Sequence, residues 1–245
     1  MSAFAATKSL LAIDMRSVAR DSFLRWMSLL GIAMALLVRW GIPPLTDWLT
    51  REHGFDLLPY YPLIMSFMLV LMPLLAGVVL GFLLLDQKDD QTLTALQVTP
   101  LQLKGYLRYR LGSAMLISAL LTIVVMKIAG LIPVALGPLL LMALMVSPLG
   151  AFFALFLAAF ANNKVQGMAL TKANGILTLP PVVAWFVDPP WQWAFGLAPT
   201  FWPSKAFWVY AQSGQIHLGH WLFGLVFLSV CTWLMLKRFN TVMSR

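Results

Sequence analysis

The chain has 245 residues, of which 60% are apolar and only 11% are charged, and its mean hydropathy is +0.83. A soluble domain usually contains about 25% charged residues, because most of its surface must be polar, so this composition excludes an ordinary soluble protein. The single cysteine, Cys231, excludes a disulfide or a thiolate metal site within the chain. The net charge of +8 arises from cations that flank apolar runs. We therefore expect these cations to lie beside a lipid bilayer, and we expect no binding to nucleic acid.

Six apolar runs are near the length of roughly 20 residues that a membrane-crossing helix needs. The runs are continuous rather than alternating, which predicts helices and excludes a β-barrel. We therefore predict an all-α integral membrane protein in which residues 1–245 form one transmembrane domain. The predicted spans are 22–41, 57–85, 106–128, 138–161, 166–187 and 220–236.

Residues 1–21 precede the first span and contain no uninterrupted apolar core of the kind found in a signal peptide. Leu10, Leu11 and Met15 fall on one side of a helix, with basic residues elsewhere. This pattern predicts an amphipathic helix on the membrane surface, and a frayed tail is the alternative.

The cations are distributed unequally between the two sides of the predicted six-span bundle. Cytoplasmic loops carry an excess of lysine and arginine, so the distribution places both termini in the cytoplasm. One side has thirteen cations, and the other has Arg39, Arg51, Lys127 and Lys205.

Residues 86–105 form a polar segment between the second and third spans. Thr99, Pro100 and Gln102 match a capping box with proline at the first helical position. We predict a short cytosolic helix, a turn and a second helix. The alternative is a plain solvated connector, which would leave Leu93 and Leu96 exposed to water without a partner.

Residues 188–217 contain four tryptophans and four prolines between the last two spans. The uncharged part is too short and too interrupted by proline for a pair of spans. We predict a re-entrant or interfacial element on the outer side, with tryptophans at headgroup depth. The alternative is a loop that its tryptophans anchor to the membrane surface.

The sequence contains no pattern typical of an enzyme. It has no phosphate-binding G-x-x-x-x-G-K-[ST] motif, and His53, His217 and His220 lack the spacing of a zinc hydrolase. We predict no catalytic residues, no metal site and no cofactor bound by this chain. The predicted spans are almost free of ionisable groups, which argues against a proton- or sodium-coupled transporter.

A hydrophobic substrate pathway is a further expectation. Met65, Met68 and Met72 recur along the second span, and thioethers suit an adaptable apolar surface. Asn174 and Thr178 add mild polarity to the fifth span. The alternative is that these side chains only pack against neighbouring helices or lipid.

A pair of glycines in the second span has the spacing of a close helix contact. Gly77 and Gly81 form a G-x-x-x-G motif, which allows two helices to approach closely in lipid.

Three stretches, in this order, resemble type-2 ABC transporter permeases. Residues 86–101, DQKDDQTLTALQVTPL, resemble the acidic stretch after the second span of that family. Residues 161–172, ANNKVQGMALTK, resemble the cytosolic turn before its fifth span, and residues 199–203, PTFWP, resemble its outer segment. Within the family, the chain is most similar to small bacterial drug-export permeases of the fluoroquinolone-exporter type.

The resemblance implies a permease subunit in the bacterial inner membrane that dimerises with a second copy or a homologous permease. A separate ATPase subunit would bind ATP and Mg²⁺. The short helix after the second span would be the coupling helix that receives ATPase closure. The coupling residues implied by the resemblance are Asp86, Thr92, Leu93, Leu96, Thr99 and Pro100.

Two positions depart from the family pattern. Asp86 stands where glutamate is usual, which shortens the reach of a salt bridge, and Gln91 stands where glycine is usual, which removes a flexible hinge.

The leading hypothesis is an ATP-driven exporter of a hydrophobic or amphiphilic compound such as a drug, with multidrug efflux as its setting. A non-transporting membrane scaffold is the alternative, and import instead of export stays open.

Overall fold

The structure is a computed structural model that describes residues 16–17, 19–90 and 102–243, together with the side chains of all of these except 102–104. Within those ranges every regular element is a helix, which confirms the all-α class. In chain order the elements are α2 (Ser22–His53), η1 (Leu58–Tyr60), α3 (Tyr61–Asp89), α5 (Gln102–Ala129), α6 (Leu136–Phe160), α7 (Lys164–Ile176), α8 (Leu179–Trp185), η3 (Trp191–Leu197), α9 (Phe201–Ser213) and α10 (Leu218–Met243).

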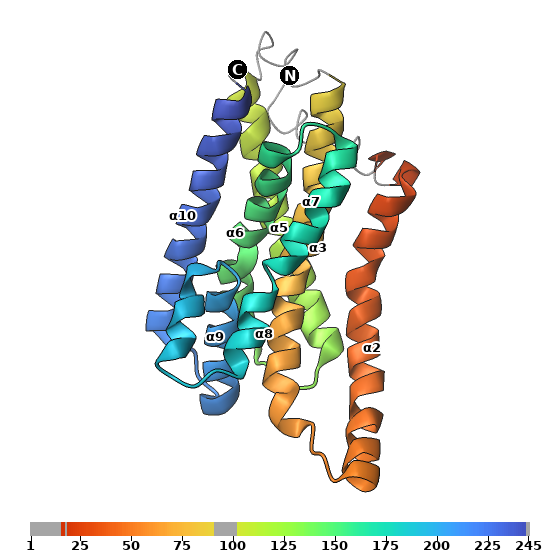
Figure 1. Cartoon of the computed structure of the whole chain (residues 1–245), viewed down its shortest axis with the longest axis vertical. Helices are drawn as coiled ribbons and strands as arrows, with labels where there is room; N and C mark the ends of the chain where they lie inside the picture. Colours follow the sequence, from red (N-terminus) through yellow and green to blue (C-terminus); the bar gives the residue numbers. More distant parts are fainter. Residues whose placement is uncertain (1–15, 18, 91–101, 244–245) are drawn as a thin grey trace.

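Five helices are long and apolar enough to cross a membrane. They are α2, α3 together with the η1 turn, α5, α6 and α10. The helices α2, α3, α5 and α6 run in alternating directions and α10 runs parallel to α6, so the start of α2 and the ends of α3, α6 and α10 lie at the same end of the bundle (Figure 1). The chain is therefore a multi-pass membrane protein.

The centre of the bundle is the contact between α3 and α6, where glycines bring the two backbones together. A Cβ atom on Gly77 would lie 2.6 Å from the carbonyl oxygen of Gly150 and 2.6 Å from Cβ of Phe153. A Cβ on Gly81 would lie 3.0 Å from the side chain of Leu157. The G-x-x-x-G motif thus lies at a close helix contact, as its spacing predicts.

The other long helices surround this central pair. α5 packs on both α3 and α6, α10 packs on α6 and α9, and α2 packs on α5 and α3 at the edge of the bundle (Figure 1). Much of the outward surface of α2 and α10 is apolar, as lipid-facing helices require.

The first helix is longer than the predicted span 22–41, because α2 continues through Pro43 and Pro44 to His53. Prolines within a helix remove backbone hydrogen bonds. Here the hydroxyl of Thr46 donates to the Ile42 carbonyl and also lies 3.0 Å from the hydroxyl of Tyr61. These contacts hold the extended part of α2 against the start of α3.

The predicted span 166–187 corresponds to two shorter helices, α7 and α8. The break falls at Leu177 and Thr178. The Thr178 side chain donates to the Gly175 carbonyl at 2.6 Å, and the Thr200 hydroxyl donates to the Leu177 carbonyl at 2.6 Å. Prolines 180 and 181 then begin α8 without the backbone donors that a continuous helix would need.

The segment 188–217 folds back against the core through α9. The indole of Trp208 donates to the Ser66 hydroxyl at 2.8 Å, and Phe201 and Phe207 are fully buried. The side chain of Lys205 donates to Gln192 at 2.6 Å. This segment is therefore a packed helical element at the end of the bundle opposite to the start of α7 (Figure 1).

Candidate functional site

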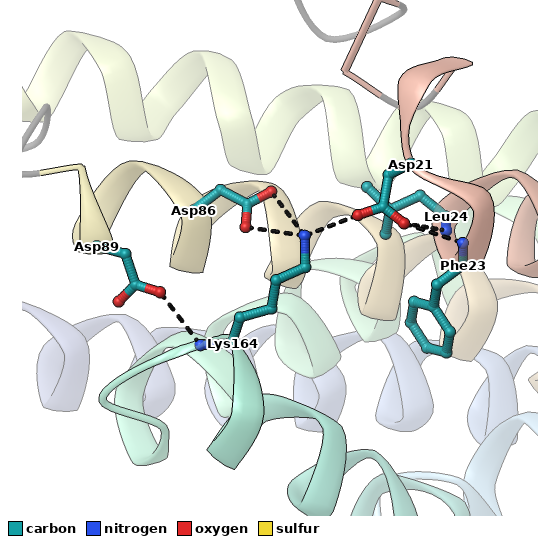
Figure 2. A network of polar contacts seen from close by, with 6 residues as sticks. All are labelled: Asp21, Phe23, Leu24, Asp86, Asp89 and Lys164. Atoms are coloured by element: carbon teal, nitrogen blue, oxygen red, sulfur yellow. Dashed lines mark hydrogen bonds and ion pairs between the residues drawn. The ribbon is translucent and has the colours of Figure 1, made fainter.

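Three helix ends meet at one lysine. Lys164 is the first residue of α7, Asp21 caps the start of α2, and Asp86 lies in the last turn of α3. The Lys164 Nζ atom lies 2.7 Å from Oδ2 of Asp21 and 3.2 Å from Oδ1 of Asp86 (Figure 2). Since the two carboxylates come from different helices, one ammonium group joins α2, α3 and α7.

Asp21 has a second role because it is also the N-cap of α2. Its Oδ1 atom accepts hydrogen bonds from the backbone N–H groups of Phe23 at 2.9 Å and Leu24 at 3.2 Å (Figure 2). The Phe23 ring packs edge-on against Phe82 of α3, with centroids 5.1 Å apart. The start of α2 is therefore fixed to α7 by an ion pair and to α3 by an aromatic contact.

The turn between α6 and α7 is bound to the same end of α3. Asp89 accepts a hydrogen bond from the backbone N–H of Lys164 at 3.2 Å, and Lys88 donates to the Ala161 carbonyl at 3.0 Å. Asp21, Asp86, Asp89 and Lys164 together are called the Lys164 cluster below.

A third connection from this end of α3 reaches α5. The hydroxyl of Tyr106 hydrogen bonds to Oε1 of Gln87 and accepts a hydrogen bond from Nε of Arg110 at 2.9 Å. Arg110 is fully buried, so its charge needs such polar neighbours. The last turns of α3 are thus joined to α2, α5 and α7.

The electrostatics around Asp21 and Lys164 favour the charged forms of these two groups. The hydrogen bond from Lys164 is the largest influence on Asp21 and holds the pKa of that carboxyl below its ordinary 3.8, although burial opposes it. Burial acts to lower the pKa of Lys164, but the hydrogen bonds and charges of Asp21 and Asp86 outweigh this effect and raise that pKa above 10.5. The ion pair between Asp21 and Lys164 is therefore fully formed at neutral pH.

Of the predicted coupling residues, the structure places Asp86 in the Lys164 cluster. The other five, Thr92, Leu93, Leu96, Thr99 and Pro100, lie outside the described residues. The helix α3 continues to Asp89, one turn beyond the predicted end of the span, because its charged residues bond to the neighbouring turn instead of entering a loop. The Lys164 cluster therefore lies at the start of the predicted coupling segment, residues 86–105.

The predicted pathway residues fall into two groups. Met65, Met68 and Met72 are buried in the core between α3 and its neighbours, and Met72 also lines a cavity. Asn174 and Thr178 lie at the break between α7 and α8. Asn174 is fully buried, and its side-chain amide has no hydrogen-bond partner among the described residues.

The cavity that Met72 lines has a volume of about 340 Å³ and lies between α2, α3 and α5. Sequence reasoning did not find this cavity, nor the pairing of Asp21 with Lys164. A signal for the N-cap role of Asp21 was present, since an aspartate precedes an apolar helix. No local signal links it to a lysine that lies 143 residues away.

No three His, Cys, Asp or Glu side chains gather to form a possible metal site within the described ranges. His217 and His220 do approach each other, with 3.1 Å between their Nδ1 atoms, at the far end of the bundle from the Lys164 cluster.

Comparison with known proteins identifies the family. Residues 14–236 match the family model of the fluoroquinolones export permease protein Rv2686c-like. Two proteins from Mycobacterium tuberculosis strains, CDC 1551 / Oshkosh and ATCC 25618 / H37Rv, are each 34% identical over 233 residues, which covers 93% of this chain and 91% of each relative. Both are named fluoroquinolones export permease proteins. No solved structure matches the chain. The chain therefore belongs to the Rv2686c-like family of fluoroquinolone export permeases.

Proposed function

We propose that the chain is the membrane-spanning permease subunit of an ATP-driven exporter that moves amphiphilic aromatic compounds of the fluoroquinolone kind. The Lys164 cluster is the observation that carries the proposal, because it joins three helices at the point where the predicted coupling segment begins. The names of the two mycobacterial relatives support the substrate class.

The proposed topology has six crossings and both termini in the cytoplasm of a bacterial inner membrane. The 13 residues of α7 and the seven of α8 give a combined length of about 30 Å, which matches the hydrocarbon thickness of a bilayer. Together they would form one interrupted crossing. The excess of cations at the Lys164 end supports its cytoplasmic position.

The Lys164 cluster suits the transmission of force. In this proposal, a separate ATPase subunit binds ATP and Mg²⁺ and docks on residues 86–105, with Leu93 and Leu96 as apolar contacts. Closure of the ATPase subunits would move the end of α3. Because Lys164 joins Asp86 to Asp21, α2 and α7 would move with it as one body.

The cycle needs a second permease, either another copy or a homologue, because alternating access requires two halves that open in turn. ATP binding would favour the outward-open dimer and hydrolysis would restore the inward-open one. This chain would supply the substrate pathway and the surface on which the ATPase subunit docks, whereas the ATPase subunit would hydrolyse ATP. Residues 188–217, as a re-entrant or interfacial element, would form the outer end of the permease.

The docking surface can be tested by the double substitution Leu93→Asp with Leu96→Asp in cells that co-express the ATPase subunit. We expect loss of co-purification and of vanadate-sensitive fluoroquinolone transport in inside-out vesicles. Leu197→Asp is the matched control, because Leu197 is highly exposed in η3 at the opposite end.

Unchanged association and transport in the double variant would overturn the docking proposal. If the wild-type chain binds the ATPase subunit but moves no fluoroquinolone, a non-transporting scaffold is the better description. Movement of drug in the opposite direction would replace export with import.

A further inference from the structure

The cavity between α2, α3 and α5 is elongated and starts near the Lys164 end of the bundle. Its lining on α5 extends from Tyr109 to Val125, a rise of about 24 Å along the helix. On α3 it extends from Met72 to Leu83, and on α2 it covers Met27 to Ile32. A volume of about 340 Å³ falls within the range of about 300–1,000 Å³ that is usual for sites of drug-sized molecules.

Small side chains create this space. Gly31, Ala76 and Ser113 contribute little volume to the walls. Gly31 also allows α2 to approach α3, since a Cβ atom there would lie 2.8 Å from the sulfur of Met72. Larger residues at these positions would fill the cavity.

The walls are suited to an apolar ring system. None of the lining residues is charged, and the hydroxyls of Ser28 and Ser113 donate to carbonyls of their own helices at 2.9 and 2.8 Å. Met27 and Met72 contribute thioethers, which make favourable contacts with aromatic rings. A charged group is costly to bury among such walls, so it would stay at the end of the cavity near Tyr109.

The helix α2 forms the outer wall of the cavity. Its packing is chiefly against α3 and α5, and its opposite face is exposed, with Trp26 at 74% and Leu37 at 58%. Figure 1 shows α2 at the edge of the bundle. A single peripheral helix therefore separates the cavity from the surrounding lipid.

We propose that this cavity binds an aromatic amphiphile from the lipid leaflet at the Lys164 end, with its ring system between α2, α3 and α5. The inference rests on the proposed function and assigns a binding site to it. All of the lining comes from one chain, so binding should require neither a second permease nor ATP.

The test is a fluorescence titration of a fluoroquinolone against the purified chain in lipid nanodiscs. Ser113→Leu and Ala76→Leu place extra carbons in the cavity, and each should weaken the measured Kd by about tenfold or more, equivalent to about 1.4 kcal/mol. Gly112→Leu is the matched control on the neighbouring position of α5, because a Cβ there has no atom within 4 Å. It should bind within about twofold of the wild-type chain.

A second measurement does not depend on variants that may differ in folding. A photoreactive fluoroquinolone bound to the wild-type chain should label peptides containing residues 27–32, 72–83 or 109–125. Labelling confined to other helices, or an equal Kd for the filled and control variants, would overturn the site. Displacement of a bound acyl chain with no fluoroquinolone binding would assign the cavity to lipid and would also overturn it.

The two proposals fail in distinguishable ways. ATP-dependent export by both the wild-type chain and the filled variants would leave the proposed function in place and remove the site. Binding without any ATP-dependent export would retain the site and remove the proposed function.

Discussion

Lys164 of α7 lies 2.7 Å from Asp21 and 3.2 Å from Asp86, so a single ammonium group bridges two carboxylates from two other helices. The three side chains are partly exposed, between 24% and 35%. An ion pair at that exposure contributes about 1 kcal/mol or less to stability, so the cluster is better suited to fixing relative positions than to holding the fold.

Lys164→Met should therefore leave the chain folded but weaken coupling. Removal of the ammonium also leaves Asp21 and Asp86 near each other without a counter-charge. We expect fluoroquinolone efflux to fall about fivefold, corresponding to about 1 kcal/mol of lost coupling, while the ATPase subunit still co-purifies. Lys164→Arg retains the charge and should recover much of the efflux. Equal efflux in Lys164→Met and the wild-type chain would contradict this role.

Two substitutions at Asp21 separate its cap from its charge. Asparagine is as good an N-cap as aspartate, so Asp21→Asn should keep the bonds to Phe23 and Leu24 but lose the ion pair. Asp21→Ala should lose both and be less stable than Asp21→Asn by about 1 kcal/mol. Thermal unfolding in detergent measures the difference. Two variants of equal stability would show that the cap contributes nothing.

The pKa shifts predict the pH range of the ion pair. Because the folded pKa of Asp21 is lowered, its stabilisation is complete above the ordinary value of 3.8 and is lost as pH falls through the folded pKa. Because the pKa of Lys164 is raised, its stabilisation is present below 10.5 and is lost as pH rises through the folded pKa. The difference in unfolding temperature between wild type and Asp21→Asn should be constant from about pH 5 to about pH 9. A difference that varies steeply inside that range would contradict the assignment.

The long helices could be predicted from the sequence because lipid requires continuous apolar runs with internally bonded backbones. The break in the fifth apolar run could not be located from hydropathy, since Leu177 and Thr178 interrupt no apolar pattern. Prolines 180 and 181 were the available signal, and the Thr200 hydroxyl that bonds to the Leu177 carbonyl comes from a distant segment. A contact of that kind has no signature in a single sequence.

Only part of the candidate site could be predicted from the sequence. Asp86 was found through resemblance to a family, because a polar stretch after the second span is recognisable. Its partners Asp21 and Lys164 are joined to it only by the fold. The cavity depends on which faces of three helices meet. The sequence alone does not show that small residues such as Gly31 and Ser113 line a cavity, because it does not show which helix faces are in contact.

A substitution at Asn174 tests whether this buried side chain contacts the substrate or only packs against neighbouring helices. Its amide has no hydrogen-bond partner among the described residues, so Asn174→Leu removes an unpaired polar group and should not lower the unfolding temperature. If Asn174 contacts substrate during transport, efflux should nevertheless fall. Retained efflux with raised stability would assign Asn174 to packing. Ser118→Ala is the control, because its hydroxyl is likewise buried and unpaired among the described residues but lies against Gly150 at the contact of α5 with α6.

The contact between α3 and α6 should be the most sensitive place in the fold to a single added carbon. In Gly77→Ala the new methyl group would meet the Gly150 carbonyl oxygen and the Phe153 Cβ at 2.6 Å, and neither atom can move without its helix. Overpacking of this kind costs about 1–3 kcal/mol, so the unfolding temperature should fall measurably. Gly112→Ala adds the same methyl group where it meets nothing within 4 Å, and it should leave the unfolding temperature unchanged or slightly raised. Equal unfolding temperatures for the two variants would contradict the close approach of α3 to α6.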